Sequence, residues 1–207
     1  MLFERFLRKK TLMAALALTA AVPSVAKASM LSAAPTADGE NQKLKPGVYY
    51  IVNDKRQKGT DLHVFVDDKG TLHGQHYSSP STDFSDLFLL HAKDGRYTIQ
   101  SLKNAKYVQS VGQNNEVYKT ANDAYKFRII YQTESSGTGK SYFNIYNDNV
   151  GANEFCWHLD AQRNVVRWYP LRDNGRIALG PSEFRLDPVT TLSKQQVLDR
   201  LAELTKI

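Results

Sequence analysis

Three segments of the chain share one pattern of apolar and polar residues. Each is rich in Tyr, Phe, Ile and Val and leads into a polar loop, which is typical of a short β-strand. The three copies are Tyr49–Asp54, Tyr97–Leu102 and Phe143–Asp148. With Ile51, Ile99 and Ile145 in register, the copies lie 48 and 46 residues apart. A fixed period of this length indicates a repeat architecture.

Each repeat continues in the same order after its first strand. A polar loop leads into a strand–turn–strand stretch, and an apolar strand that carries Phe88, Phe127 or Phe184 then ends the repeat. The strand–turn–strand stretches are Leu62–Leu72, Tyr107–Val117 and Cys156–Val166. Three all-β units of about 45 residues predict a β-trefoil over residues 46–188, in which six strands close a barrel and three hairpins cap it. Closure removes exposed sheet edges, and we expect the three phenylalanines in the barrel core.

The first 28 residues have the pattern of a secretory signal peptide. A basic start precedes the twelve-residue apolar stretch Thr11–Val22, and Ala26–Ala28 provides a small-x-small cleavage motif. Twelve residues fall short of the roughly 20 needed to cross a bilayer. We therefore expect cleavage near Ala28, a periplasmic or secreted protein, and no membrane span in the mature chain.

Removal of this segment changes the charge of the protein. The full chain has 27 basic and 21 acidic residues, a net charge of +6, but the first 28 residues contribute five of the basic residues and one acidic residue. The mature chain keeps 22 basic and 20 acidic residues, a net charge of +2. A nucleic-acid-binding protein needs a concentrated basic surface, so we do not expect nucleic acid as a partner.

The sequence changes character on either side of the repeats. Residues 29–45 are small and polar without periodicity, which predicts a disordered leader. After Pro188, within residues 189–207, Ser193 and Gln196 form a capping box that begins a helix of about 13 residues. Its apolar residues at helical spacing are Leu192, Val197, Leu198, Leu201 and Leu204. The helix either packs over the open end of the barrel or docks on a partner chain, since a short amphipathic helix is marginal unless packed.

The residues that usually carry catalysis or metal binding form no motif here. The single Cys156 cannot form an internal disulfide, and its apolar neighbours indicate a small buried residue. The five His residues lack the Cys or carboxylate spacing that completes a tetrahedral metal site. Hydrolase, zinc-protease and phosphate-loop motifs are absent from the sequence. We therefore expect no metal, no cofactor and no enzymatic activity.

The three repeats resemble those of ricin B-type lectin domains. The resemblance covers about residues 46–188 and implies a β-trefoil that binds sugars in shallow pockets, one per repeat. In that family an early acid takes sugar hydroxyls, a hairpin aromatic stacks on the ring, and a polar pair before a Gln-x-Trp-like run completes the site. The Gln-x-Trp run is absent here, because the repeats close on Asp86–Phe88, Tyr125–Phe127 and Glu183–Phe184.

The family's order of acid, aromatic and polar pair recurs in two repeats. The third repeat offers Asp148, Trp168 and Tyr169, followed by Ser182–Glu183. The first offers Asp54, Gln75 and Tyr77, followed by Ser85–Asp86. The second repeat has no acid in its loop, so we interpret it as a structural copy. Apolar sugar faces need a flat aromatic beside a carboxylate, so the third repeat is the preferred sugar site and the first a weaker one.

These observations favour a non-catalytic, exported carbohydrate-binding protein. The alternative is a protein-interaction β-trefoil, such as a toxin receptor-binding subunit or a protease inhibitor, with the C-terminal helix as the partner contact. The predicted partner is thus a glycan or a protein. The aromatics of the proposed site could also simply pack at the barrel cap.

Overall fold

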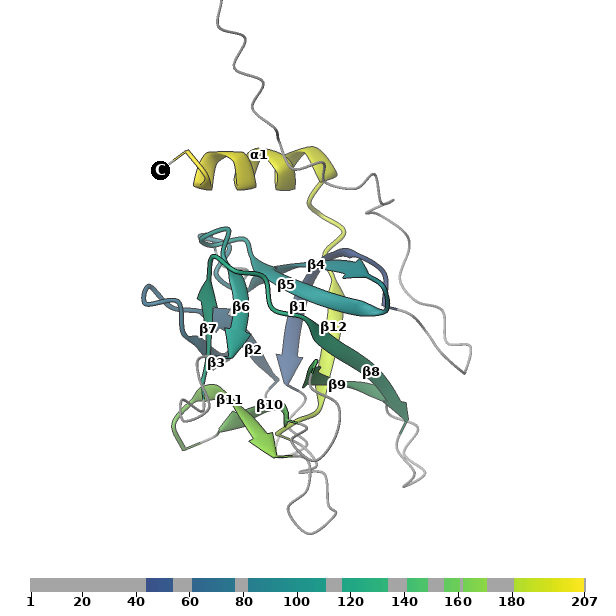
Figure 1. Cartoon of the computed structure of the whole chain (residues 1–207). Coiled ribbons are helices and arrows are strands. Elements are labelled where there is room, and N and C mark those ends of the chain that lie inside the picture. The colour runs from purple at the N-terminus through teal and green to yellow at the C-terminus, as the bar shows by residue number, and fades with distance from the viewer. Residues whose placement is uncertain are drawn as a thin grey trace, which may run out of the picture.

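In the part of the chain that the structure describes, twelve strands follow one another in three groups of four, and one helix comes after them (Figure 1). The computed structural model describes residues 44–53, 61–76, 82–110, 117–133, 141–148, 155–160, 162–170 and 181–206. The signal peptide and nearly all of the predicted leader lie outside the described residues.

The strand bounds match the predicted repeats. The first repeat contains β1 (Gly47–Asn53), β2 (Leu62–Val66), β3 (Leu72–His76) and β4 (Leu87–Lys93). The second contains β5 (Arg96–Ser101), β6 (Tyr107–Ser110), β7 (Tyr118–Ala121) and β8 (Phe127–Thr133). The third contains β9 (Ser141–Asn147), β10 (Phe155–Asp160), β11 (Val165–Pro170) and β12 (Phe184–Pro188).

Six of the strands form a closed ring. β1 pairs with β4 and β12, β5 pairs with β4 and β8, and β9 pairs with β8 and β12, all antiparallel. The first and last strands of every repeat thus build the barrel. This is the six-stranded barrel that the repeats predict.

The other six strands form three hairpins that cap one end of the barrel. β2 pairs with β3, β6 with β7, and β10 with β11. Backbone pairings also join neighbouring hairpins, at Val165–His73, Thr71–Lys119 and Val117–Arg167. A closed barrel with a triplet of hairpins is a β-trefoil, so the predicted fold is confirmed.

Aromatic side chains fill the centre of the barrel. Phe88, Phe127 and Phe184 are fully buried, as expected from their repeated positions. Trp157 lies among them, with ring centroids 5.7 Å from Phe127 and 6.0 Å from Phe184. Tyr118 adds a ring 5.1 Å from Trp157. Such large buried rings supply much of the apolar area that stabilises a small domain.

The barrel end opposite the hairpins is closed by the start of the described chain. Leu44 is buried in the same cluster as the barrel core, beside Tyr49 and Tyr97. Tyr97 donates a hydrogen bond from its hydroxyl to the Leu44 carbonyl (2.9 Å), and Tyr49 donates one to the Lys45 carbonyl (2.8 Å). Burial raises the pKa of both tyrosines. The segment before β1 therefore stabilises this end of the barrel.

The C-terminal helix α1 (Lys194–Leu204) begins as predicted. Ser193 is the N-cap, its hydroxyl accepts the Gln196 N–H, and the Gln196 side chain accepts the Ser193 N–H. This reciprocal pair satisfies two backbone donors that the first turn would otherwise leave unbonded. Among the described residues, no helix is long and apolar enough to cross a membrane.

The helix packs on the outer wall of the barrel, so the prediction that it covers the open end is wrong. Phe88 points into the barrel, and the alternation of β4 therefore turns Leu87 and Leu89 outward. Val197 of α1 and Val189 after β12 bury these two leucines in a second apolar cluster. A barrel strand that is apolar on both faces needs such a cover.

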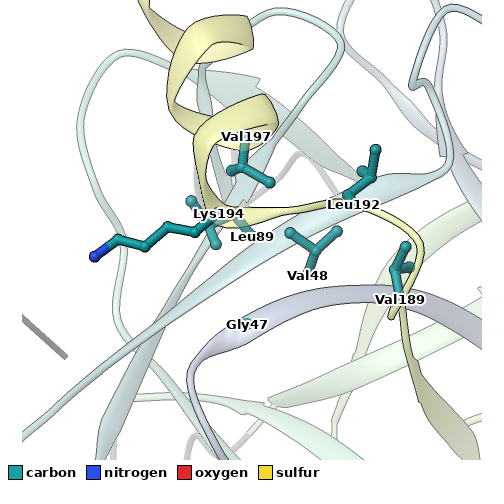
Figure 2. A pocket seen from close by; sticks show the side chains of 7 residues that line it. All are labelled: Gly47, Val48, Leu89, Val189, Leu192, Lys194 and Val197. Carbon is teal, nitrogen blue, oxygen red and sulfur yellow. The ribbon is translucent and has the colours of Figure 1, made fainter. Parts of the chain in front are cut away.

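A shallow groove runs between the start of α1 and the barrel wall (Figure 2). Its lining is Gly47, Val48, Leu89, Val189, Leu192, Lys194 and Val197. Further along the helix, Arg200 donates from Nε to the Leu102 carbonyl (3.2 Å) and lies over the Phe84 ring at 5.1 Å. The apolar stripe of the helix is thus used within the chain.

Candidate functional site

The β10–β11 hairpin determines which way the predicted aromatics of the third repeat point. Its register places Trp157 opposite Trp168 and Cys156 opposite Tyr169. Opposite residues share a face of an antiparallel pair, and successive residues alternate between faces. Trp168 and Tyr169 therefore lie on opposite faces of the hairpin and do not form one flat surface.

Trp168 lies on the face that meets the barrel core. Its ring centroid is 3.8 Å from that of Phe155, and it packs against the main core cluster that contains Trp157. Trp168 remains partly buried rather than fully enclosed. Its main role in the structure is therefore packing at the barrel cap.

Tyr169 lies on the outward face and stacks on His158. The two ring centroids are 4.9 Å apart with an interplanar angle of 23°. His158 Nδ1 lies 3.3 Å from the hydroxyl oxygen of Ser182, a member of the predicted polar pair. Ser182 itself is fully buried, so its hydroxyl holds the imidazole from beneath while the Tyr169 and His158 rings remain partly exposed.

The outward face also carries an ion pair. Arg167 lies directly opposite His158, and its guanidinium is 2.9 Å from Oδ2 of Asp160. Oδ1 of the same carboxylate accepts the backbone N–H groups of Gln162 and Arg163 in the turn. We call Tyr169, His158, Arg167 and Asp160 the outer strip.

The chemistry of the outer strip suits a ligand with apolar and hydroxyl surfaces. Aromatic rings contact apolar C–H groups, whereas the guanidinium and carboxylate form directional hydrogen bonds with hydroxyls. All four side chains are partly exposed. The sequence suggests a role for His158 only as one of five His residues that could bind a metal. His158 lies two residues after Cys156 and therefore on the same face of the strand. This spacing is the signal that could have identified His158 as a site residue.

The first repeat builds a corresponding surface with different residues. Val52 directly follows Ile51 and pairs with His63. Tyr146 directly follows Ile145 and pairs with Cys156, so His63 and Cys156 occupy equivalent positions in their repeats. Counting onward and following the hairpin register gives the remaining equivalences. Phe65 corresponds to His158, His73 to Arg167, Gln75 to Tyr169, and Asp67 to Asp160.

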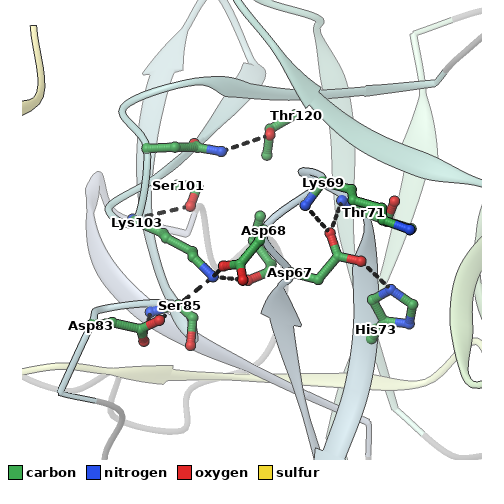
Figure 3. Close-up of polar contacts among 12 residues, drawn as sticks. Asp67, Asp68, Lys69, Thr71, His73, Asp83, Ser85, Ser101, Lys103 and Thr120 are labelled. Atoms are coloured by element: carbon green, nitrogen blue, oxygen red, sulfur yellow. Dashed lines mark hydrogen bonds and ion pairs between the residues drawn. The ribbon is translucent and has the colours of Figure 1, made fainter. Parts of the chain in front are cut away.

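A carboxylate–imidazole hydrogen bond occupies the positions equivalent to the ion pair of the outer strip (Figure 3). Asp67 Oδ2 lies 2.9 Å from His73 Nε2, and its Oδ1 accepts the N–H groups of Lys69 and Thr71. Partial burial raises the pKa of the Asp67 carboxyl, but these hydrogen bonds outweigh burial and hold the pKa below its ordinary value. His73 also bonds through Nδ1 with the Asn164 carbonyl of the third repeat (2.8 Å).

The other predicted site residues lie elsewhere. Asp148 follows β9 and forms an ion pair with Arg96 at the start of β5, at the junction of two repeats. Gln75 is exposed on β3, opposite His63. Asp54 and Tyr77 lie outside the described residues. The structure thus places Tyr169 and Ser182 in contact with the same His158 ring but does not place Trp168 on that surface.

Cys156 and the polar pair Ser182–Glu183 help to hold the loop before β12 in place. Cys156 is buried, and burial raises the pKa of its thiol. Glu183 is also buried, and its carbonyl accepts a 2.8 Å hydrogen bond from the Asn53 amide. Asn144 donates likewise to the Ser182 carbonyl at 2.9 Å. These contacts fix the loop that presents the Ser182 hydroxyl to His158.

Metal binding has no further support in the arrangement of the described residues. His63 lies opposite Gln75, and His73 lies opposite Phe65, so the two His residues are not direct neighbours across the hairpin. Among the described residues, no three His, Cys, Asp or Glu side chains gather as metal ligands would.

Comparisons with known proteins agree on the fold. No protein-family model matches the sequence, and neither does any curated protein. A ricin B-like lectin from Macrolepiota procera, solved with lactose, aligns with a TM-score of 0.50 and 12% identity over 72% of this chain and 100% of the lectin. The Rhizoctonia solani agglutinin aligns with a TM-score of 0.49 and 18% identity, over 72% of this chain and 100% of the agglutinin.

An enzyme is also among the similar structures. A GlcNAcα1-4Gal-releasing endo-β-galactosidase from Clostridium perfringens aligns with a TM-score of 0.50 and 11% identity. The match covers 69% of this chain but 32% of the enzyme, so the chain spans about a third of that protein. At these identities, the likenesses at a TM-score of 0.50 show the fold alone, which is the β-trefoil that the repeats predict.

Proposed function

We propose that this β-trefoil is an exported, non-catalytic carbohydrate-binding protein whose main ligand surface is the outer strip of the third repeat. The observation that carries the proposal is the stack of Tyr169 on His158, with the Ser182 hydroxyl at the imidazole. The outer strip takes the place of Asp148, Trp168 and Tyr169 as the proposed sugar site of the third repeat. Of those three residues, Tyr169 is the one on this surface.

The outer strip offers both kinds of contact that a sugar requires. The Tyr169–His158 pair supplies aromatic surface for the C–H face of a pyranose. Asp160 and Arg167, both partly exposed, supply a carboxylate and a guanidinium that can bond with ring hydroxyls. Because the strip is a surface rather than a deep pocket, the expected binding is weak for a monosaccharide and stronger for several linked sugars or sites.

The first repeat carries a second, weaker proposed site. Gln75, exposed on β3, stands where the third repeat has Tyr169. An amide supplies hydrogen bonds but little apolar surface, so a sugar here would depend on Tyr77 and Asp54. Both residues lie outside the described part of the chain.

The alternative is a protein-interaction module, which the lost Gln-x-Trp runs favour. That alternative used the C-terminal helix as the partner contact. Val197 and Leu201 of the helix instead pack on the barrel wall, and α1 lies far from β10 and β11 in Figure 1. We therefore favour the glycan ligand over a protein docked on the helix.

A glycan array tests the proposal with residues 29–207 and a Tyr169→Ala variant. We expect the wild-type protein to retain a set of glycans and the variant to lose them with an unchanged fold. Tyr131→Ala is the matched control, because Tyr131 is a partly buried aromatic of the β8–β9 hairpin, outside the strip. A folded wild-type protein that retains no glycan would contradict the proposal, as would equal binding by the Tyr169→Ala variant.

A further inference from the structure

We infer that the Asp160–Arg167 pair acts as a charge filter that makes the outer strip select uncharged glycans over acidic ones. The inference rests on the proposed function and specifies the substrate class of the same site. It concerns specificity, which neither the fold nor the similar structures assign.

Asp160 is held in place by the turn that it stabilises. Its Oδ1 accepts the N–H groups of Gln162 (2.9 Å) and Arg163 (3.1 Å), which leaves Oδ2 directed at Arg167 (2.9 Å). Only 15% of the Asp160 side chain and 23% of the Arg167 side chain are exposed. A fixed, mostly buried carboxylate thus neutralises the cation of the strip.

An acidic sugar would have to compete with this carboxylate. Uronic and sialic acids are bound best by an arginine that can offer its fork to the ligand carboxylate. Here Asp160 already occupies part of that fork, and a second carboxylate beside it would meet like-charge repulsion in a partly desolvated place. Neutral hydroxyls meet no such repulsion and can bond to either partner.

The neighbouring hairpin repeats the arrangement. Val165 lies opposite His73 across the contact of β11 with β3, so the two outer surfaces adjoin. There Asp67 faces His73 as Asp160 faces Arg167, and its carboxyl pKa lies below the ordinary value. An anionic ligand lying across both hairpins would therefore face two turn-held aspartates.

The test compares methyl β-D-glucoside with methyl β-D-glucuronide, which differ only in the carboxylate at C6. Binding to wild-type protein and Asp160→Asn is followed by NMR titration of backbone amides. Asparagine keeps the Oδ1 acceptor for the turn and removes the charge. We expect wild type to bind the glucoside more tightly than the glucuronide. Asp160→Asn should bind the glucuronide about tenfold tighter than wild type does, the size of one charge-assisted contact.

Two control variants separate the filter from general charge effects. Asp61→Asn removes an equal charge from the pair with Arg185 (2.9 Å), outside the strip, and should leave glucuronide binding unchanged. Asp160→Asn combined with Arg167→Gln should lose the gain. Near-ultraviolet circular dichroism confirms that each variant remains folded.

The outcomes distinguish the inference from the proposed function. A wild-type preference for glucuronide, or no gain in folded Asp160→Asn, would overturn the charge filter even if the glycan array is positive. A blank array with no binding of either glycoside would overturn the proposed function and, with it, the filter that rests on it.

Discussion

Asp67 and Asp160 occupy equivalent places in two hairpins and make the same two kinds of contact. Each accepts two turn N–H groups at Oδ1 and pairs through Oδ2 with a cationic or basic side chain on the returning strand. The basic partner is His73 in the first repeat and Arg167 in the third. The repeats have diverged in nearly every outward residue, yet the carboxylate that organises the turn is present in both.

Replacement of Asp67 by Asn should reduce stability in a pH-dependent way. Because the pKa of Asp67 in the folded protein lies below its ordinary value of 3.8, the folded state binds the proton less readily than the unfolded chain. Its contribution is therefore full above that value and is lost as the pH falls through the lower, folded-state pKa. We expect Asp67→Asn to cost about 1 kcal/mol at pH 7, measured by urea unfolding, and almost nothing at strongly acid pH.

Asp123 provides the control for this experiment, because it is an exposed Asp before β8. Asp123→Asn should change the free energy of unfolding little at either pH. An Asp67→Asn cost that stays constant across the whole pH range would show that charge is not the cause.

His63 should make the protein less stable in mild acid. Burial lowers the pKa of His63, and Arg185 lowers it further, while Asp187 and Asp61 act in the opposite direction. As the pH falls below the ordinary value of 6.5, the unfolded chain takes up this proton before the folded protein does, so the free energy of unfolding decreases. The melting temperature should therefore fall between neutral pH and mild acid, and His63→Gln should make this fall smaller. His76→Gln, at an exposed His, should leave the fall unchanged.

Trp168 and Tyr169 should respond differently to replacement by Ala. Trp168 packs against Phe155 and the core, so Trp168→Ala should lower the free energy of unfolding by about 2–3 kcal/mol. Tyr169 lies on the outward face, so Tyr169→Ala should cost less than about 1 kcal/mol. Chemical denaturation of the two single variants measures the difference, and equal costs would refute the assignment of faces.

The contact of α1 with the barrel wall should be measurable through Val197. Val197 is the buried residue of the helix, and Val197→Ala should lower the free energy of unfolding by about 1–2 kcal/mol through lost apolar contacts. Gln195→Ala on the exposed side should change it by less than about 0.5 kcal/mol. If the two variants behaved alike, the helix would not be packed on the wall in solution.

The sequence predicts the fold well because its evidence is local and repeated. The three isoleucines recur at nearly constant spacing, the last strand of every repeat carries one phenylalanine, and each set occupies equivalent places in the barrel core. The helix start is equally local, since Ser193 and Gln196 are three residues apart. Signals that lie within a few residues, or repeat three times, do not require knowledge of tertiary contacts.

The parts that failed depend on contacts between distant residues. Asp148 pairs with Arg96, 52 residues away, and nothing near either residue indicates this. The position of α1 follows from the outward direction of Leu87 and Leu89, which only the barrel register reveals. Signal peptide, export and carbohydrate binding remain predictions that await experiment.

One error at the site could have been avoided from the sequence. Trp168 and Tyr169 are consecutive in a strand, and consecutive residues point to opposite faces. The same rule places Arg167 and Tyr169 together, with His158 across from them. Which of the two faces is outward depends on the barrel, and that was the information the sequence lacked.

The pairing of β1 with β12 affects when this protein can finish folding. Ile51 lies opposite Leu186, and Val189 donates a backbone hydrogen bond to Val48, so the start and the end of the repeats are direct neighbours. A chain emerging from a ribosome or a translocation channel exposes its first strand long before its last. Such non-local contacts make folding slow, and the ring stays incomplete until synthesis or transport is almost over. The β1 strand therefore keeps an unpaired edge, on which other strands can add, until the last repeat has been made.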